Sequence, residues 1–201
     1  MGLIESVSFV LLCIFGISYI GKLIILSKKN NIKANVFGKG IKSKEILIIE
    51  KFLKAVTFAG IGIWTFSALF SSFTEKWFVG LGKSFTASIL GVVITLIGVS
   101  LFILAMVFMK TSWRAGIDKS TKTSLVTSGL YRFSRNPAFV GMDLMFIGTA
   151  ITHLNLMTVV VAILVVTGIH LQILQEEKHM KEVFKNEYNE YVNKTPRYLL
   201  F

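Results

Sequence analysis

The feature that most constrains this chain is the recurrence of apolar stretches long enough to cross a lipid bilayer. A membrane helix needs roughly 20 apolar residues, and the stretches that approach or exceed this length are 3–27, 52–73, 85–109 and 139–174. His153, Leu154 and Asn155 interrupt the last stretch and divide it into two shorter helices. We therefore predict an all-α, polytopic membrane protein with about five transmembrane helices, of which the last two form a hairpin.

The first helix of this hairpin is short for a membrane span. Its roughly 15 residues, 138–152, would reach only about 22 Å, against about 30 Å for the hydrocarbon core. The sequence leaves open whether this helix crosses completely. The first apolar stretch carries Glu5 near its start and has neither a basic segment before it nor a small-residue cleavage site after it. We therefore expect it to remain as an anchor.

The basic residues lie in three segments that flank the apolar stretches. Residues 28–54 carry eight lysines, 110–135 carry six Lys and Arg, and 178–197 carry five, whereas the loop 74–84 has only two. The positive-inside rule predicts that the three basic segments are cytoplasmic and that the N-terminus lies outside. Because these residues border membrane helices, the net charge of +11 favours anionic lipid headgroups as partners and argues against nucleic acid. The oligomeric state stays open.

We predict one integrated domain with two parts. Residues 1–109 form a three-helix membrane scaffold, in which small residues let neighbouring helices approach closely: Gly60, Gly62, Gly91 and Gly98. Residues 110–201 supply a cytosolic loop, the hairpin and a C-terminal amphipathic helix, which together form the site. Packing alone would also explain the aromatic stripe of that last helix.

Two polar motifs bracket the hairpin: GLYRFSRNPAFVG at 129–141 and QEEKHMKEVFKNEYNEYVNKTPRY at 175–198. A chain that crosses a membrane out and back returns to the side it left, so both motifs should meet at one membrane surface. We predict that they are two halves of one site. The single cysteine, Cys13, excludes a cysteine-based zinc cluster, and no two histidines stand at metal-ligand spacing, so we predict no metal site.

The first motif has the character of an anion-binding helix start. Pro137 fits the first turn of a helix, where the backbone amides are free to bind an anion. Arg132 and Arg135 beside it can hold a carboxylate or a phosphate by paired hydrogen bonds. The alternative is that both arginines only mark the cytosolic boundary.

The second motif places two carboxylates, Glu176 and Glu177, at the membrane surface. A carboxylate at this depth is costly unless it meets a cation, which a positively charged ligand would supply. The alternative is a solvated pair that faces nearby lysines. Asp143 is an intramembrane carboxylate and so a candidate functional or buried paired residue, and His170 adds polar atoms to the next helix, where a packing role is the alternative.

These motifs, in this order, resemble those of the isoprenylcysteine carboxyl methyltransferase and phospholipid methyltransferase group of integral-membrane methyltransferases. The resemblance runs from Trp113 to the C-terminus, and its elements are WRAGI at 113–117, LVTSGLYRFSRNPAFVG at 125–141, the paired glutamates, and FKNEYNEYVNKTPRYL at 184–199. It implies that S-adenosylmethionine binds at the cytosolic face, between the RNP and EE segments, and that its methyl group passes to a lipophilic acceptor from the bilayer.

The resemblance also implies roles for individual residues. Those implied for the cofactor are Tyr131, Arg135, Asn136, Pro137, Gly141, Glu176, Glu177 and Tyr188. Arg135 and Glu177 are the candidate catalytic residues, and Asp143, His170 and Arg197 are the candidates for binding the acceptor. The family pattern often reads RHPxYxG, and here Asn136 stands at the histidine position. Asparagine keeps a hydrogen bond but cannot act as an acid or base near neutral pH.

Two other functions stay open on the sequence alone. The first is a membrane reductase of the sterol or steroid type, which would bind NADPH and whose distant members share an RNP-like turn. The paired glutamates argue against it, because a cofactor with several phosphates needs clustered basic residues. The second is a non-enzymatic membrane scaffold or lipid binder, in which the motifs are only boundary charges.

Overall fold

The computed structural model describes residues 2–82, 84–119 and 123–199, and in these residues the chain is helical without a named strand. The α-helices are α1 (Leu3–Asn30), α2 (Lys44–Leu69), α3 (Ser71–Trp77), α4 (Phe85–Phe108), α5 (Pro137–Thr152) and α6 (Leu156–Lys194), and two short 3-10 helices are η1 (Lys110–Ser112) and η2 (Gly129–Arg132). The predicted all-α class is confirmed. Lys83 and Lys122, which belong to the predicted charge pattern, lie outside the described residues.

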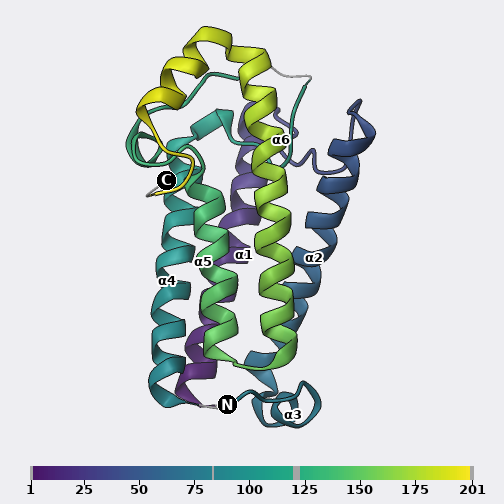
Figure 1. Ribbon diagram of the computed structural model, residues 1–201, viewed down its shortest axis with the longest axis vertical. Coiled ribbons are helices and arrows are strands. Elements are labelled where there is room, and N and C mark those ends of the chain that lie inside the picture. Colours follow the sequence, from purple (N-terminus) through teal and green to yellow (C-terminus); the bar gives the residue numbers. More distant parts are fainter. Residues whose placement is uncertain (1, 83, 120–122, 200–201) are drawn as a thin grey trace.

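Five of the helices run side by side, and α3 caps one end of the bundle together with the N-terminus (Figure 1). The opposite end carries the 31–43 loop, the long 109–136 connection and the C-terminal part of α6 (Figure 1). All three belong to the basic segments of the sequence. The fold therefore gathers these segments at one end of the molecule, far from the N-terminus.

Local sequence signals explain where the helices begin. Ser43 caps α2 by accepting a hydrogen bond from the amide of Ile46. Pro137 stands in the first turn of α5, where its missing amide hydrogen costs nothing. Asn155 and Thr158 form a reciprocal capping box at the start of α6. The predicted break of the hairpin at 153–155 is confirmed, since α5 ends at Thr152 and α6 begins at Leu156.

Glycines hold α4 and α5 in close contact. A Cβ atom added at Gly98 would lie 2.6 Å from the carbonyl oxygen of Gly141, and one added at Gly148 would lie 2.7 Å from that of Gly91. Backbones can approach this closely only where side chains are missing. The prediction for Gly91 and Gly98 is confirmed, whereas it is wrong for Gly62, whose added Cβ would meet nothing within 4 Å.

The C-terminal part of α6 is set off from the rest of the helix by a kink. We expected a C-terminal amphipathic helix after the hairpin, and the residues that follow the non-helical Lys185 (φ 46°, ψ −116°) form a helical segment that ends at Lys194. The residues after the kink turn across the end of the bundle (Figure 1). Tyr188 and Tyr191 on this turned part are buried. The kink lets a single long helix serve both as a membrane helix and as a cover for the site.

Among the described residues, three helices are long and apolar enough to cross a membrane: α1, α4 and α6. α5 is apolar but has only 16 residues, about 24 Å of helix. Large apolar side chains are exposed along the outer faces of α1 and α4, for example Ile17 and Leu96. Exposed apolar faces on long apolar helices are those of an integral membrane protein.

Candidate functional site

The two polar motifs meet through an ion pair. Arg135, just before α5, donates from Nε and Nη2 to Oε1 of Glu177 on α6, at 3.1 and 3.0 Å. Both side chains are 9% exposed. The prediction that the motifs share one surface is therefore confirmed by a direct contact between residues 42 positions apart in the chain.

Glu177 is saturated with hydrogen-bond donors. Arg197 donates from Nε and Nη2 to Oε2 at 3.1 and 2.9 Å, and the side-chain amide of Asn136 donates to Oε1 at 3.2 Å. Arg135 also donates to the carbonyl of Thr195 at 2.8 Å. Glu177 thus joins the start of α5, α6 and the C-terminal segment, and its carboxylate is used within the protein.

Further hydrogen bonds tie the C-terminal segment to the first motif. The amide of Arg135 donates to the carbonyl of Pro196 at 2.9 Å, and the hydroxyl of Ser134 donates to the carbonyl of Arg197 at 3.1 Å. The hydroxyl of Tyr191 donates to the carbonyl of Tyr131 in η2. These bonds fix the RNP turn from both sides, so the backbone around the start of α5 is held in place before any ligand arrives.

Beside this network lies a cavity of about 1170 Å³. Its apolar walls come from four helices: Leu12 and Phe15 of α1, Leu53 and Ile61 of α2, Phe102 of α4, and Phe139 and Met142 of α5. Its other walls come from the 31–43 loop, the long connection and α6, which supply charged and polar side chains. One cavity thus presents a lipophilic part and a polar part to a ligand.

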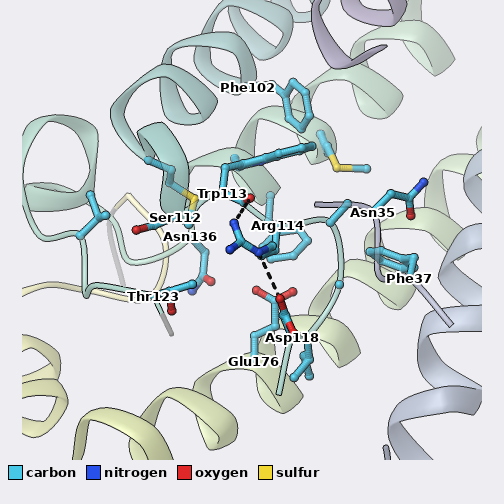
Figure 2. Close-up of a pocket in the computed structure, with 18 of the residues that line it drawn as sticks. Asn35, Phe37, Phe102, Ser112, Trp113, Arg114, Asp118, Thr123, Asn136 and Glu176 are labelled. Carbon is cyan, nitrogen blue, oxygen red and sulfur yellow. Dashed lines mark hydrogen bonds and ion pairs between the residues drawn. The ribbon is translucent and has the colours of Figure 1, made fainter. Parts of the chain in front are cut away.

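Residues 113–118 form one wall of the cavity. Arg114 donates from Nε to Asp118 at 3.1 Å and from Nη1 to the carbonyls of Thr111 and Trp113. Figure 2 shows Arg114, Asp118 and Glu176 directed toward the same part of the cavity, between Trp113 and α6. The cation of Arg114 and the carboxylates of Asp118 and Glu176 thus line a cavity that Trp113 also lines.

Glu176 differs from its neighbour Glu177. It lines the cavity, and its Oε1 accepts one hydrogen bond, from the side chain of Gln172 at 3.0 Å. Its Oε2 accepts none from the described residues. His179, one turn further along α6, also lines the cavity, and its buried Nδ1 has no hydrogen-bond partner among the described residues. Both groups are available to a ligand.

Tyr131 and Arg197 keep their protonation states over the physiological range. Burial, assisted by the charge of Glu176, raises the pKa of the Tyr131 phenol, which stays neutral. The hydrogen bond to Glu177 raises the pKa of Arg197, which stays cationic. Neither residue is suited to accept or release a proton near neutral pH.

The structure brings together only some of the predicted site residues. Those that line the cavity are Tyr131, Arg135, Asn136, Glu176, Glu177 and Tyr188. Those that do not line it are Pro137, Gly141, Asp143, His170 and Arg197. Gly141 packs against α4, and His170 hydrogen-bonds to the Tyr198 hydroxyl. The predicted role of each residue in binding or catalysis stays a prediction.

Sequence reasoning did not assign roles to several residues of the cavity walls. Trp113 and Arg114 were part of the recognised WRAGI element, but Asp118 and His179 were not considered. The sequence signal for Trp113 and Arg114 is their position in a long connection, because long connections between packed helices are commonly functional. His179 follows Glu176 by three positions on a helix, which places both side chains on one face.

Comparison with known proteins adds an independent finding. Residues 86–187 match the family model described as phospholipid methyltransferase. "Probable protein-S-isoprenylcysteine O-methyltransferase" of Oryza sativa subsp. indica is 28% identical over 159 residues, 78% of this chain and 79% of that protein. "Protein-S-isoprenylcysteine O-methyltransferase" of Saccharomyces cerevisiae is 39% identical over 82 residues, 39% of this chain and 34% of that protein. The family match includes the first polar motif and residues 175–187 of the second.

Proposed function

Because the chain belongs to the phospholipid methyltransferase family, we propose that it is an integral-membrane enzyme that transfers a methyl group from S-adenosylmethionine to a lipophilic acceptor. The observation that carries this proposal is the single cavity with a polar part beside Glu176 and an apolar part among α1, α2, α4 and α5. The volume of about 1170 Å³ exceeds the roughly 300–1000 Å³ of pockets that hold one drug-sized molecule, as a cavity for a cofactor and an acceptor requires.

The residues of the polar part fit this cofactor. S-adenosylmethionine carries an ammonium group and ribose hydroxyls, and when bound it supplies an electrophilic methyl group on sulfur. Glu176 has an unused carboxylate oxygen for the ammonium or the ribose, and His179 has an unused ring nitrogen. The rings of Tyr131 and Tyr188 offer surfaces for the adenine or the sulfonium.

We assign positioning roles to Arg135 and Glu177. Their side chains bond to each other and to the C-terminal segment, so they hold the RNP turn rather than compete for the ligand. Methyl transfer is an in-line displacement that depends on alignment and on exclusion of water more than on a strong base. The buried network and the apolar walls meet both requirements.

The acceptor in this proposal enters the apolar part of the cavity. The two relatives are named for prenylated cysteine, whose carboxylate is one candidate acceptor, and a lipid or a lipophilic thiol are the others. In this scheme five helices cross the membrane, and the end with the cavity faces the cytoplasm, as the positive-inside rule favours. The lysines at that end would contact anionic lipid headgroups.

The test is methyl transfer from S-adenosylmethionine labelled on its methyl group. Purified protein is incubated with the labelled donor and either a membrane lipid extract or a prenylated cysteine analogue. Label released as methanol by mild base identifies a carboxyl methyl ester, and label that resists base identifies methylation of nitrogen or sulfur. We expect Glu176→Gln to lose transfer, and Glu187→Gln, an exposed residue of the same helix, to keep it. No transfer to any fraction would contradict the proposal.

A further inference from the structure

A buried ion pair outside the cavity joins the 31–43 loop to α2. Nζ of Lys42 lies 2.7 Å from Oε2 of Glu50, and the two side chains are 3% and 0% exposed. Glu50 stands on α2, and Lys42 belongs to the 31–43 loop that precedes it. Neither residue lines the cavity.

Glu50 uses both carboxylate oxygens to bind backbone amides. Oε2 accepts from the amide of Gly38 at 2.6 Å, and Oε1 accepts from the amide of Ile117 at 2.9 Å. Lys42 in turn donates to the carbonyl of Val36 at 2.8 Å. A single carboxylate therefore fastens the 31–43 loop and the 113–118 wall to α2.

The two segments also pair directly with each other. The amide of Val36 donates to the carbonyl of Ala115 at 3.0 Å, and the amide of Ala115 donates to that of Ala34 at 2.8 Å. Gly116 has φ +92°, and a Cβ there would lie 3.0 Å from Oε1 of Glu50 and from the backbone of Phe37. Only glycine allows both this backbone conformation and this close approach.

This arrangement determines where the cavity wall lies. Ile117 is bonded to Glu50, and Arg114 and Asp118 of the same segment face the cavity. Asn35 and Phe37 of the 31–43 loop line it as well (Figure 2). A buried ion pair costs desolvation that a well-packed apolar pair would avoid, so overall stability alone is a poor explanation for it.

We propose that Glu50, balanced by Lys42, is a positioning residue for the cofactor site: it holds residues 113–118 and the 31–43 loop in the geometry that binds S-adenosylmethionine. The proposal rests on the function proposed above for the cavity. It makes the first loop part of the site, although that loop precedes the family-matched residues 86–187. Glu50 acts through the backbone and is not itself expected to touch the ligand.

The test compares Glu50→Gln with Glu45→Gln in the full-length protein. Glutamine has one oxygen and one amide group, so it can accept from only one of the two backbone amides and repels the other. Glu45 is a matched control, because it lies on the same helix, its bond to Gln175 is exposed, and neither residue lines the cavity. Lys42→Gln is the second variant, which leaves both backbone amide donors of Glu50 in place and removes the balancing charge together with the ammonium that binds the Val36 carbonyl.

Two quantities are measured: the Kd of S-adenosylhomocysteine by calorimetry, and hydrogen exchange along the backbone. For Glu50→Gln we expect a Kd raised at least about tenfold, because two hydrogen bonds to a charged group are disturbed. Exchange should become faster in 34–38 and 113–118 and stay unchanged in α4 and α5. Lys42→Gln should show the same pattern more weakly, and Glu45→Gln should match the unmodified protein.

The outcomes separate this proposal from the one it rests on. An unchanged Kd in both Glu50→Gln and Lys42→Gln would overturn the positioning role, and so would exchange that rises equally in α4 and α5. If Glu50→Gln does not fold, Lys42→Gln decides the question by the same two measurements. If the unmodified protein does not bind S-adenosylhomocysteine, the proposed function fails, and with it the role of Glu50 at a cofactor site. Hydrogen exchange in 34–38 and 113–118 would still show whether Glu50 holds the two segments.

Discussion

Glu176 and Glu177 are neighbours in the chain, but their carboxylates meet different surroundings. Glu177 accepts hydrogen bonds from two arginines and an asparagine, whereas Glu176 accepts one from Gln172 and faces the cavity. Successive residues of a helix point about 100° apart, so one step along α6 separates a carboxylate bound by two arginines from one that keeps an oxygen open to the cavity.

Replacing Glu177 should therefore lower stability. In Glu177→Gln one arginine keeps an oxygen acceptor, while the other faces an amide group and loses its counter-charge. Leaving an arginine of this network without its acceptor is expected to cost about 1–3 kcal/mol of unfolding free energy. Thermal unfolding in detergent measures this, with Glu187→Gln as the exposed control. A melting temperature equal to that of the control would contradict the network described for Glu177.

The sequence could predict that the two motifs meet, but it could not predict which of the two glutamates binds the arginines. The meeting follows from the topology of a hairpin, which needs only the apolar pattern. The rotation of α6 about its axis depends on the packing of all its faces, which one sequence does not determine. Glu50 was missed for a related reason, because its partners Gly38 and Ile117 are backbone amides, which leave no signature in side-chain patterns.

At the scale of the elements, the contact between α4 and α5 depends on missing side chains. In Gly98→Val the new side chain would begin 2.6 Å from the carbonyl oxygen of Gly141, so the helices must separate. Overpacking of this kind is expected to cost about 2–3 kcal/mol. Gly62→Ala is the control, since its Cβ would meet nothing within 4 Å. Equal melting temperatures for the two variants would contradict the close packing of α4 on α5.

The kink in α6 makes a second prediction at this scale. Lys185 has φ 46°, a conformation that costs a residue with a side chain about 1–2 kcal/mol. We expect Lys185→Gly to raise the unfolding free energy by up to about 1 kcal/mol. The matched variant Lys181→Gly lies in regular helix and should lower it by about 1 kcal/mol. A loss of stability in both variants would mean that α6 is straight at Lys185.

Helix periodicity identified the two parts of α6 but not their continuity. The sequence from 175 to 198 changes from apolar to strongly charged, and such a change is typical of a chain that leaves the membrane as a new element. The kink requires no proline or glycine, since Lys185 itself adopts the unusual backbone conformation. Tertiary bonds near its end, such as that of Tyr191 to Tyr131, hold the turned part in place.

At the scale of the whole molecule, the charge pattern and the fold both distinguish one end of the helix bundle from the other. The basic segments gather at the end with the cavity, and α3 lies with the N-terminus at the other (Figure 1). This supports the orientation proposed above. Cysteine labelling tests this orientation. Single cysteines are placed at the exposed residues Lys39 and Ser72 in a chain whose own cysteine is replaced, Cys13→Ala.

In intact spheroplasts we expect a membrane-impermeant maleimide to label Ser72→Cys and not Lys39→Cys. After permeabilisation both positions should react, which shows that each cysteine is accessible. The reverse pattern would place the cavity on the outer side. It would then contradict a cytoplasmic active site while leaving the chemistry of the cavity untouched.

The most direct measurement of the central claim is calorimetric titration of the detergent-purified protein with S-adenosylhomocysteine and, separately, with NADPH. Binding of S-adenosylhomocysteine at one site per chain, weakened by Glu176→Gln and kept by Glu187→Gln, is the result that the cavity predicts. Binding of NADPH alone would contradict the methyltransferase proposal in favour of a reductase, and binding of neither would leave the cavity without the cofactor that this account assigns to it.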